Sequence, residues 1–194
     1  MLRTIKRHIK KFNKLSNWIK ILIALIVILV VFKFSEKKRE PFSQKKKFIL
    51  KEGLQVYDDF YCGIYDELVF DKVKNEYEIG EIINVTKPTS QSKLLDVGSG
   101  TGEIVSLFNK KGINAQGLEL SDAMVKKSQK KFPQLKFTHD DVTKVMVFPA
   151  NSFTHITCLY FTIYYLKNKQ QFFKNCYDWL MPGGTLIINL ANRS

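Results

Sequence analysis

The sequence has few cysteines, and the three that are present stand far apart. Cys62, Cys158 and Cys176 form no C-x-x-C pair. So few and so widely spaced cysteines exclude the dense disulfide framework of small secreted domains. A reducing compartment is the simpler interpretation, and no metal site is indicated.

Acidic residues are scarce at the start of the chain. Residues 1–51 contain 15 Lys and Arg but only 2 Asp and Glu, which accounts for the whole formal net charge of +13. Residues 52–194 contain 16 residues of each sign and are neutral. A domain that binds nucleic acid carries a basic face. The neutral body therefore argues against a nucleic-acid partner.

An unbroken apolar run lies inside the basic arm. Ile21–Phe32 contains twelve apolar residues between Lys20 and Lys33. Lysine side chains can extend to the membrane interface, and a helix over 15–34 would be about 30 Å long. With Trp18 as an interfacial aromatic residue, the pattern predicts a single transmembrane helix.

Other interpretations of this run are a buried core helix, a cleaved signal peptide and a mitochondrial presequence. The flanking basic segments argue against a core helix, and no small residues follow the run to form a cleavage site. The two flanks carry similar positive charge, so the positive-inside rule does not orient the span. The predicted organisation is a basic tail (1–14), a transmembrane helix (15–34), a basic linker (35–51) and one domain (52–194).

The body alternates short apolar runs with amphipathic segments. Such alternation predicts an α/β fold, with a mostly parallel sheet covered by helices on both faces. Tyr57 to Phe70 suggests an opening helix, and Ile79 to Ile83 lies in a second. The expected strands are 93–97, 115–120, 135–138, 153–160 and 185–190, and the expected helices between them are 103–111, 121–132 and 168–180.

The strongest motif is LLDVGSGTG at 94–102, a glycine-rich turn between a strand and a helix. Glycines let a ligand approach the backbone, and the helix start adds free N–H groups. Glu119, at the end of the second strand, can accept hydrogen bonds from ribose hydroxyls. Two features depart from a dinucleotide site. Glu103 stands where the third glycine of G-x-G-x-x-G belongs, and Asp96 would repel a pyrophosphate.

These motifs resemble those of class I S-adenosylmethionine-dependent methyltransferases over about residues 55–190. LLDVGSGTG is similar to the family's first motif, GLELSDAM to its second and HDDV at 139–142 to its third. The resemblance implies a Rossmann-like fold and S-adenosyl-L-methionine as cofactor. The cofactor-binding residues that it implies are Asp96, Gly98, Ser99, Gly100, Thr101, Gly102, Glu119, Leu120, Asp141 and Val142.

The acceptor side is less well marked. Segments around Tyr61 and Tyr65 resemble the opening helix that covers the cofactor in many small-molecule members, and either tyrosine could equally be a core residue. His155 and Tyr164 are the other candidates, although His155 lies on a buried strand. The segment 159–165 lacks the Asn/Asp-Pro-Pro-Tyr and Pro-Cys signatures of enzymes that methylate nucleic-acid bases.

The family pattern continues beyond the fifth strand, whereas this sequence ends at Ser194. We therefore expect a sheet without the usual sixth and seventh strands, and an exposed fifth-strand edge that pairs with a protein partner or a second copy. The expected function is a membrane-anchored methyltransferase whose domain faces the cytosol, acting on a small-molecule, lipid-like or protein acceptor. The alternative is a noncatalytic, shortened module that acts through cofactor or protein binding.

Overall fold

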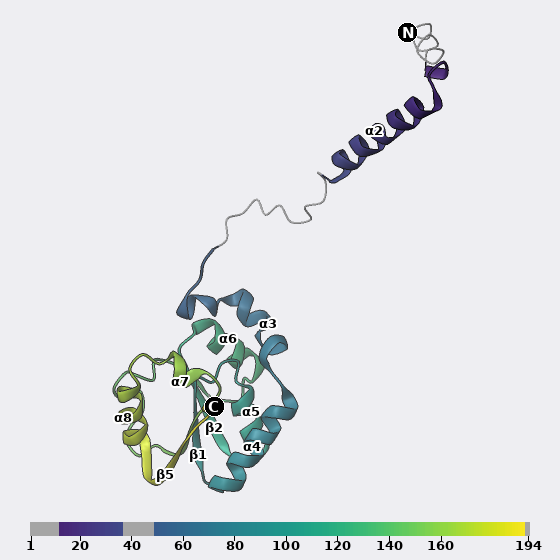
Figure 1. Cartoon of the computed structure of the whole chain (residues 1–194). Helices are drawn as coiled ribbons and strands as arrows, with labels where there is room; N and C mark the ends of the chain where they lie inside the picture. Colours follow the sequence, from purple (N-terminus) through teal and green to yellow (C-terminus); the bar gives the residue numbers. More distant parts are fainter. Residues whose placement is uncertain (1–11, 37–48, 193–194) are drawn as a thin grey trace. The chain divides into compact units, whose positions relative to one another are not determined.

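The computed structural model describes residues 12–36 and 49–192, and the chain divides into two units, 1–49 and 50–194. Figure 1 colours the chain along its sequence, and each unit is described separately. The predicted basic tail and basic linker fall largely on residues 1–11 and 37–48, which lie outside the described residues. The predicted domain boundaries therefore stay predictions.

The first unit contains helix α2 (Asn17–Glu36). Most of its apolar side chains from Trp18 to Phe32 are exposed, and Ile23 is partly buried. Across the described residues, no helix combines enough length with enough apolar character to cross a membrane. The prediction of a transmembrane helix over 15–34 is corrected accordingly: the unbroken apolar run covers about 18 Å at 1.5 Å per residue, against about 30 Å of hydrocarbon. The membrane location inferred from it has no support.

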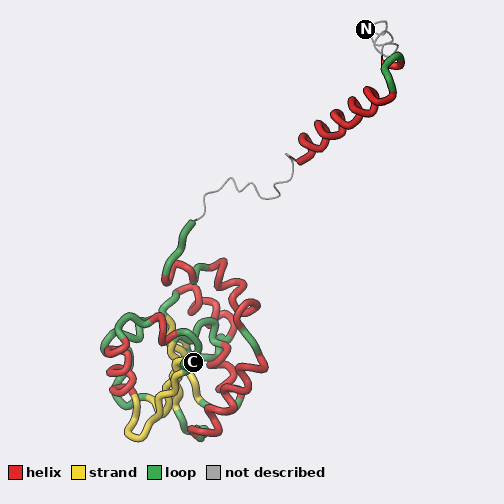
Figure 2. The backbone as a smooth tube through the Cα atoms, viewed as in Figure 1, coloured by secondary structure: helices red, strands yellow, loops and turns green. Residues whose placement is uncertain are grey.

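The second unit is built on one parallel sheet (Figure 2). Its strand order is β3-β2-β1-β4-β5. The chain adds β2 and β3 on one side of β1 and then adds β4 and β5 on the other side. This arrangement confirms the Rossmann-like prediction, with five strands among the described residues. The strands are β1 (Lys93–Val97), β2 (Asn114–Glu119), β3 (Phe137–His139), β4 (Phe153–Cys158) and β5 (Leu180–Ile188).

Polar side chains cap the starts of α3, α4, α6 and α8. Asp58, Asp71, Ser121 and Asn168 each accept a hydrogen bond from the backbone N–H group three residues ahead. The elements are η1 (Gly53–Val56), α3 (Asp59–Val69), α4 (Lys72–Thr86), α5 (Glu103–Lys110), α6 (Asp122–Lys131), α7 (Thr162–Tyr165) and α8 (Lys169–Trp179).

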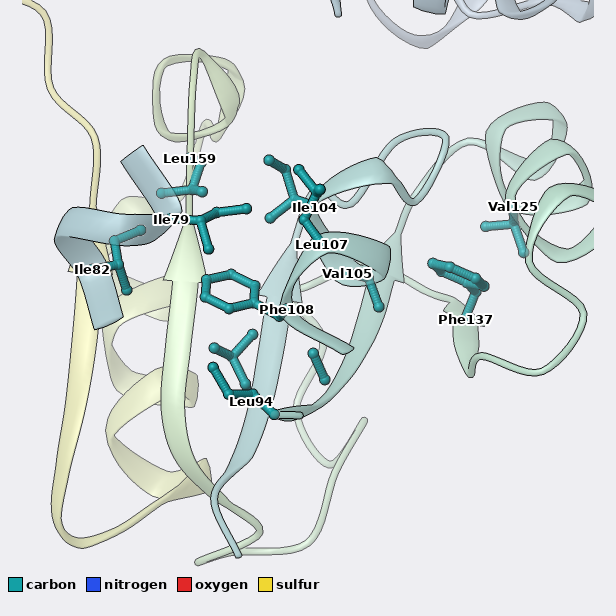
Figure 3. Packing of buried hydrophobic residues seen from close by; sticks show 12 residues of the cluster. Ile79, Ile82, Leu94, Ile104, Val105, Leu107, Phe108, Val125, Phe137 and Leu159 are labelled. Carbon is teal, nitrogen blue, oxygen red and sulfur yellow. The ribbon is translucent and has the colours of Figure 1, made fainter. Parts of the chain in front are cut away.

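One layer of the core lies between the sheet and helices α4, α5 and α6 (Figure 3). Leu94 from β1 meets Phe108 from α5 and Ile79 from α4, and all three are fully buried. Phe137 and Val125 extend this layer towards β3 and α6. Helix α4 is thus fixed to the body by apolar burial.

The other layer lies between the sheet and α8. Side chains alternate along a strand, so Leu95 points away from Leu94 and joins Ile156, Phe172 and Trp179. All four of these side chains have no more than 2% of their surface exposed. The continuous apolar runs predicted as strands are explained by this burial on both faces.

Two parts of the fold differ from the sequence-based expectation. Strand β5 begins at Leu180, five residues early, because Leu180 pairs with Phe153 and the next paired residue is Thr185. The intervening Met181–Gly184 forms an irregularity in the ladder, where Gly183 has φ +77°. The elements expected from the sequence also do not include α7, a single helical turn shortly after β4.

We predict that Phe108→Ala lowers the free energy of unfolding of the second unit by about 3–5 kcal/mol, because it leaves a cavity beneath α4. Denaturant unfolding followed by circular dichroism measures the change. Tyr177→Ala is the control, because that side chain is 81% exposed. Equal losses in the two variants would contradict the packing described for Phe108.

Candidate cofactor site at the carboxyl edge of the sheet

The candidate site lies where the strand order reverses. In parallel α/β sheets, ligands bind at the carboxyl ends of the strands at such a point. The loop 98–102 follows β1, and α5 begins directly after it at Glu103. A separate cavity of about 900 Å³ lies at the amino ends of β4 and β5, next to the end of α8, and is therefore distinct from this site.

The glycine loop is held in a tight turn. Gly98, Gly100 and Gly102 have φ values of +73°, +52° and +85°. A Cβ on Gly98 would lie 2.5 Å from the side chain of Thr162, and one on Gly102 would lie 2.5 Å from the ring of Phe137. At Gly100, a Cβ would meet only a Tyr65 ring carbon, at 3.9 Å. The backbone is therefore open to a ligand at Gly100.

Asp96 is a buried carboxylate at the end of β1. It is 3% exposed and accepts a hydrogen bond of 2.7 Å from the hydroxyl of Thr157, its paired residue on β4. Burial raises the pKa of Asp96 to about 7, and the nearby charge of Glu119 adds to the rise while the Thr157 bond opposes it. Such a group favours a positively charged ligand.

Glu119 connects the loop to the second strand. Its two carboxylate oxygens accept hydrogen bonds from the N–H of Gly100 at 2.9 Å and the N–H of Ser121 at 2.8 Å. Leu120 follows Glu119, and its carbonyl accepts a hydrogen bond of 2.9 Å from Nε2 of the His139 ring. The carboxylate thereby brings the glycine loop and the start of α6 to one point.

The third motif forms a turn after β3. Asp141 accepts hydrogen bonds of 2.8 Å from the backbone N–H and the hydroxyl of Thr143. Asp140 instead accepts from the N–H of Asp141 and pairs with Lys144 at 2.8 Å. Val142 is buried in the α8 layer, and its carbonyl accepts from an asparagine of α8. The two acids therefore have different local roles.

Tyrosine rings gather over the loop. The ring centroids of Tyr57, Tyr61 and Tyr65 lie 5.7–6.4 Å from one another. Tyr61 and Tyr65 lie one turn apart on α3, and Tyr57 lies just before that helix. Tyr165 of α7 joins them, because it lies close enough to raise the pKa of Tyr57. We call these four residues the tyrosine cluster.

Within the cluster, raised pKa values keep the hydroxyls of Tyr57 and Tyr65 protonated near neutral pH. Burial, followed by the surrounding tyrosines, raises the pKa of Tyr57 above its ordinary value. Burial and the nearby Tyr61, Glu119 and Asp66 raise the pKa of Tyr65 to about 12. The rings therefore present neutral faces and hydrogen-bonding hydroxyls rather than phenolates.

The other two acceptor candidates have different surroundings. His155 pairs with Leu94, two residues closer to the amino end of the sheet than Asp96, and its ring contacts the Thr154 hydroxyl at 2.8 Å and the Thr86 carbonyl at 3.4 Å. Tyr164 accepts a hydrogen bond of 2.7 Å from the N–H of Ala191, beyond β5. The structure does not bring His155 to the glycine loop.

Comparisons with known proteins agree with this geometry. A family model for the methyltransferase domain matches residues 95–188. Residues 95–188 thus carry the similarity of this chain to that family. S-adenosyl-L-methionine is the methyl donor of this family.

The similar enzymes have known acceptors in their names. The chain is 31% identical over 144 residues to dTDP-4-amino-2,3,4,6-tetradeoxy-D-glucose N,N-dimethyltransferase of Saccharopolyspora spinosa, covering 71% of this chain and 57% of that enzyme. It is 28% identical over 146 residues to phosphoethanolamine N-methyltransferase of Plasmodium falciparum, covering 71% and 51%. The chain thus spans about half the length of the curated relatives it matches.

Solved structures show the same fold. Phosphoethanolamine N-methyltransferase 2 of Haemonchus contortus aligns with a TM-score of 0.61 at 20% identity, over 69% of this chain and 33% of that one. A protein of Methanococcus maripaludis aligns with a TM-score of 0.64 at 18% identity, over 74% of this chain and 67% of that one.

The residues of the methyltransferase domain fit the family's cofactor. Its ammonium and sulfonium groups are positive, which suits the carboxylate of Asp96, and its ribose hydroxyls can donate to Glu119. Gly100 leaves room for close approach to the backbone. An ammonium beside Asp96 would favour the ionised carboxylate and offset the burial that raises its pKa.

Sequence reasoning missed part of this site. Thr157 supports Asp96 from β4, and Tyr165 completes the tyrosine cluster from α7. Both are distant in sequence from their partners, so no local pattern indicates the contact. The spacing of Tyr57, Tyr61 and Tyr65 was a usable signal for the rest of the cluster.

The raised pKa of Asp96 predicts how stability varies with pH. Asp96 keeps its proton up to about pH 7 in the folded chain but releases it near pH 3.8 in the unfolded chain. The free energy of unfolding therefore falls as pH rises from 3.8 through about 7. The loss is on the order of 4 kcal/mol. Thermal unfolding of the cofactor-free chain between pH 5 and pH 8 should show a steeper fall for the wild type than for Asp96→Asn, and equal slopes would refute the assignment.

The bridging role of Glu119 predicts cofactor affinity. Glu119→Ala should weaken S-adenosyl-L-methionine binding at least about tenfold, because hydrogen bonds to a charged group are lost and the loop is freed. Calorimetric titration of the full chain measures this. Glu76→Ala, which removes an exposed partner of Lys72, should bind as the wild type does. An unchanged Glu119→Ala affinity would exclude the bridge from cofactor binding.

Proposed function

We propose that this chain transfers a methyl group from S-adenosyl-L-methionine to the nitrogen of a small-molecule amine. The observation that carries the proposal is the tyrosine cluster over the open part of the glycine loop. Aromatic faces attract cations, with tyrosine among the effective rings. An amine, and the more substituted ammonium that it becomes, suits such a site.

The protonation of the cluster supports an amine acceptor. The raised pKa values keep Tyr57 and Tyr65 neutral, so neither supplies a phenolate base. An unprotonated amine can attack the methyl group as it stands and becomes an ammonium, so it needs no strong base, whereas a hydroxyl acceptor has to give up its proton to one. Neutral hydroxyls can still orient the acceptor nitrogen by accepting hydrogen bonds from its N–H groups.

The similar enzymes support the same acceptor class. An amino sugar and phosphoethanolamine are the acceptors named for two relatives that align over 71% of this chain. Demethylmenaquinone methyltransferase of Chlorobaculum parvum, 31% identical over 99 residues, is named for a quinone acceptor instead. Its shorter alignment covers 50% of this chain. A quinone is therefore the comparison acceptor for the experiment.

The proposed roles follow from the positions of the side chains. When bound, S-adenosyl-L-methionine supplies an electrophilic methyl group on a positive sulfur. Asp96 and Glu119 hold the cofactor's charged and hydroxyl groups, and the tyrosine cluster positions the acceptor and limits the access of water. This is catalysis by orientation and electrostatics, without a covalent nucleophile. The proposed cofactor contacts are Asp96, Gly98, Ser99, Gly100, Thr101, Gly102, Glu119, Leu120, Asp141 and Val142.

We predict that amines accept label from S-adenosyl-L-methionine carrying a radioactive methyl group, whereas an alcohol and a quinol, the reduced form of a quinone, do not. The panel contains ethanolamine, phosphoethanolamine, an amino sugar, a quinol and a simple alcohol. Tyr61 is the variant position, because its ring lies 5.7 Å from the rings of both Tyr57 and Tyr65. Tyr61→Leu should raise the KM for the amine roughly tenfold through loss of the aromatic face.

Tyr61→Phe is the matched control, because it keeps the ring and should keep the KM. Cofactor affinity should be the same in both variants. Transfer to the quinol alone would overturn the amine assignment, and cofactor binding without transfer to any acceptor class would count against the activity.

A further inference from the structure

Helix α3, which carries Tyr61 and Tyr65, is weakly held by apolar contacts. Cys62 is its one buried residue among those described. Phe60 and Leu68 are 75% and 64% exposed. The next helix, α4, is by contrast anchored by Ile79 and Ile82, which are 0% and 9% exposed.

The contacts that hold α3 are polar and converge on Asp66. One carboxylate oxygen accepts a hydrogen bond from the hydroxyl of Thr101 in the glycine loop. The other oxygen pairs with Lys131 at 2.9 Å and with Lys127 at 3.1 Å, both from α6. Lys131 also pairs with Glu103 at the start of α5. Asp66 therefore joins α3 directly to the loop and to α6, and Lys131 extends the connection to α5.

A second set of contacts comes from α6. The ammonium group of Lys127 donates to the backbone carbonyls of Cys62 and, at 3.2 Å, Gly63. The hydroxyl of Ser121 donates to the carbonyl of Tyr57 at 3.2 Å. Segments held by few apolar contacts and by partly exposed polar ones are those that open locally at low cost.

The electrostatics at Asp66 favour the closed arrangement. Burial alone would raise its pKa, but the bonds from Thr101, Lys131 and Lys127 outweigh burial and hold the pKa below its ordinary value. The carboxylate is thus charged at neutral pH, when all three bonds can form. Thr101 is 3% exposed, so its hydroxyl has little access to water as an alternative partner.

The connection between α3 and α4 can serve as a hinge for α3. Phe70 and Asp71 separate α3 from α4, and both have extended backbone. Phe70 packs against the core layer that holds α4. Movement of α3 about these two residues would leave α4 in place and would lift Tyr65 away from Gly100.

We propose that Asp66 is a positioning residue that latches α3 over the glycine loop, and that release of this latch gates cofactor exchange. The inference rests on the proposed cofactor site and concerns a step that precedes methyl transfer. Opening of the latch exposes the loop, and closing brings the tyrosine cluster over it. The hydrogen bond from the hydroxyl of Thr101 to Asp66 connects the loop directly to the latch.

Gating makes a kinetic prediction that a simple contact does not. If the closed helix blocks exchange, weakening the latch increases the open fraction and speeds both association and dissociation. A residue that only stabilises the bound loop would change dissociation alone. Surface plasmon resonance on the immobilised full chain, with S-adenosyl-L-methionine as the probe, measures both rates.

We expect Asp66→Ala and Thr101→Val to raise both rate constants by about tenfold or more, since each removes a charge-assisted hydrogen bond. Thr101→Ser keeps the hydroxyl and should restore both rates. Asp178→Asn, which removes the exposed pair with Lys174 on α8, should behave as the wild type does. Faster dissociation with unchanged association would overturn the latch.

Hydrogen exchange of the cofactor-free chain provides the second readout. In Asp66→Ala, peptides from α3 should exchange faster while peptides from α4 keep the wild-type rate. Unchanged α3 exchange, or equal acceleration in both helices, would also overturn the latch. If the wild type bound no cofactor, the proposed function would fail, and this measurement would still decide whether Asp66 holds α3.

Discussion

Close packing around the glycines of the loop 98–102 is the constraint on which this site depends. Gly98 lies against Thr162 and Gly102 lies against Phe137, at distances that leave no room for a Cβ. The end of β1 can therefore approach α7 on one side and β3 on the other. That approach sets the position of Gly100, which lies beneath Tyr65, and it places the start of α5 at the carboxyl edge of the sheet.

The two carboxylates near the glycine loop, Asp96 and Asp66, have opposite surroundings. Asp96 is buried beside a threonine hydroxyl and no cation, and burial raises its pKa to about 7. Asp66 has the opposite environment, because two lysines and a hydroxyl surround it. The first carboxylate suits a positive group brought from outside, whereas the second is satisfied within the chain. Perturbed groups of the first kind mark functional sites.

The same carboxyl edge combines parts of different rigidity. The sheet, α4 and α5 are fixed by buried side chains such as Phe108 and Ile79. Helix α3 is fixed mainly by hydrogen bonds and ion pairs. A rigid binding loop under a loosely attached helix gives a precise site that can still be entered, which fits the small-molecule acceptors named for the similar enzymes.

The transmembrane prediction shows where a composition-based argument exceeded its physical basis. Twelve apolar residues between two lysines are enough for a helix, and α2 is one. The prediction needed both lysines to extend to opposite interfaces to reach the required length. Local composition favours a helix strongly, but it specifies the surroundings of the helix only weakly.

The sequence by itself determined the order and type of most elements and the location of the cofactor loop. Short apolar runs, capping residues and the glycine spacing are local signals, so the sheet, the bounds of β1 and the positions of Asp96 and Glu119 were predictable. The pairing of Asp96 with Thr157, the contact of Thr101 with Asp66 and the addition of Tyr165 to the cluster were decided by the tertiary structure alone. Each joins segments that are distant in sequence, and their meeting depends on how both layers pack against the sheet.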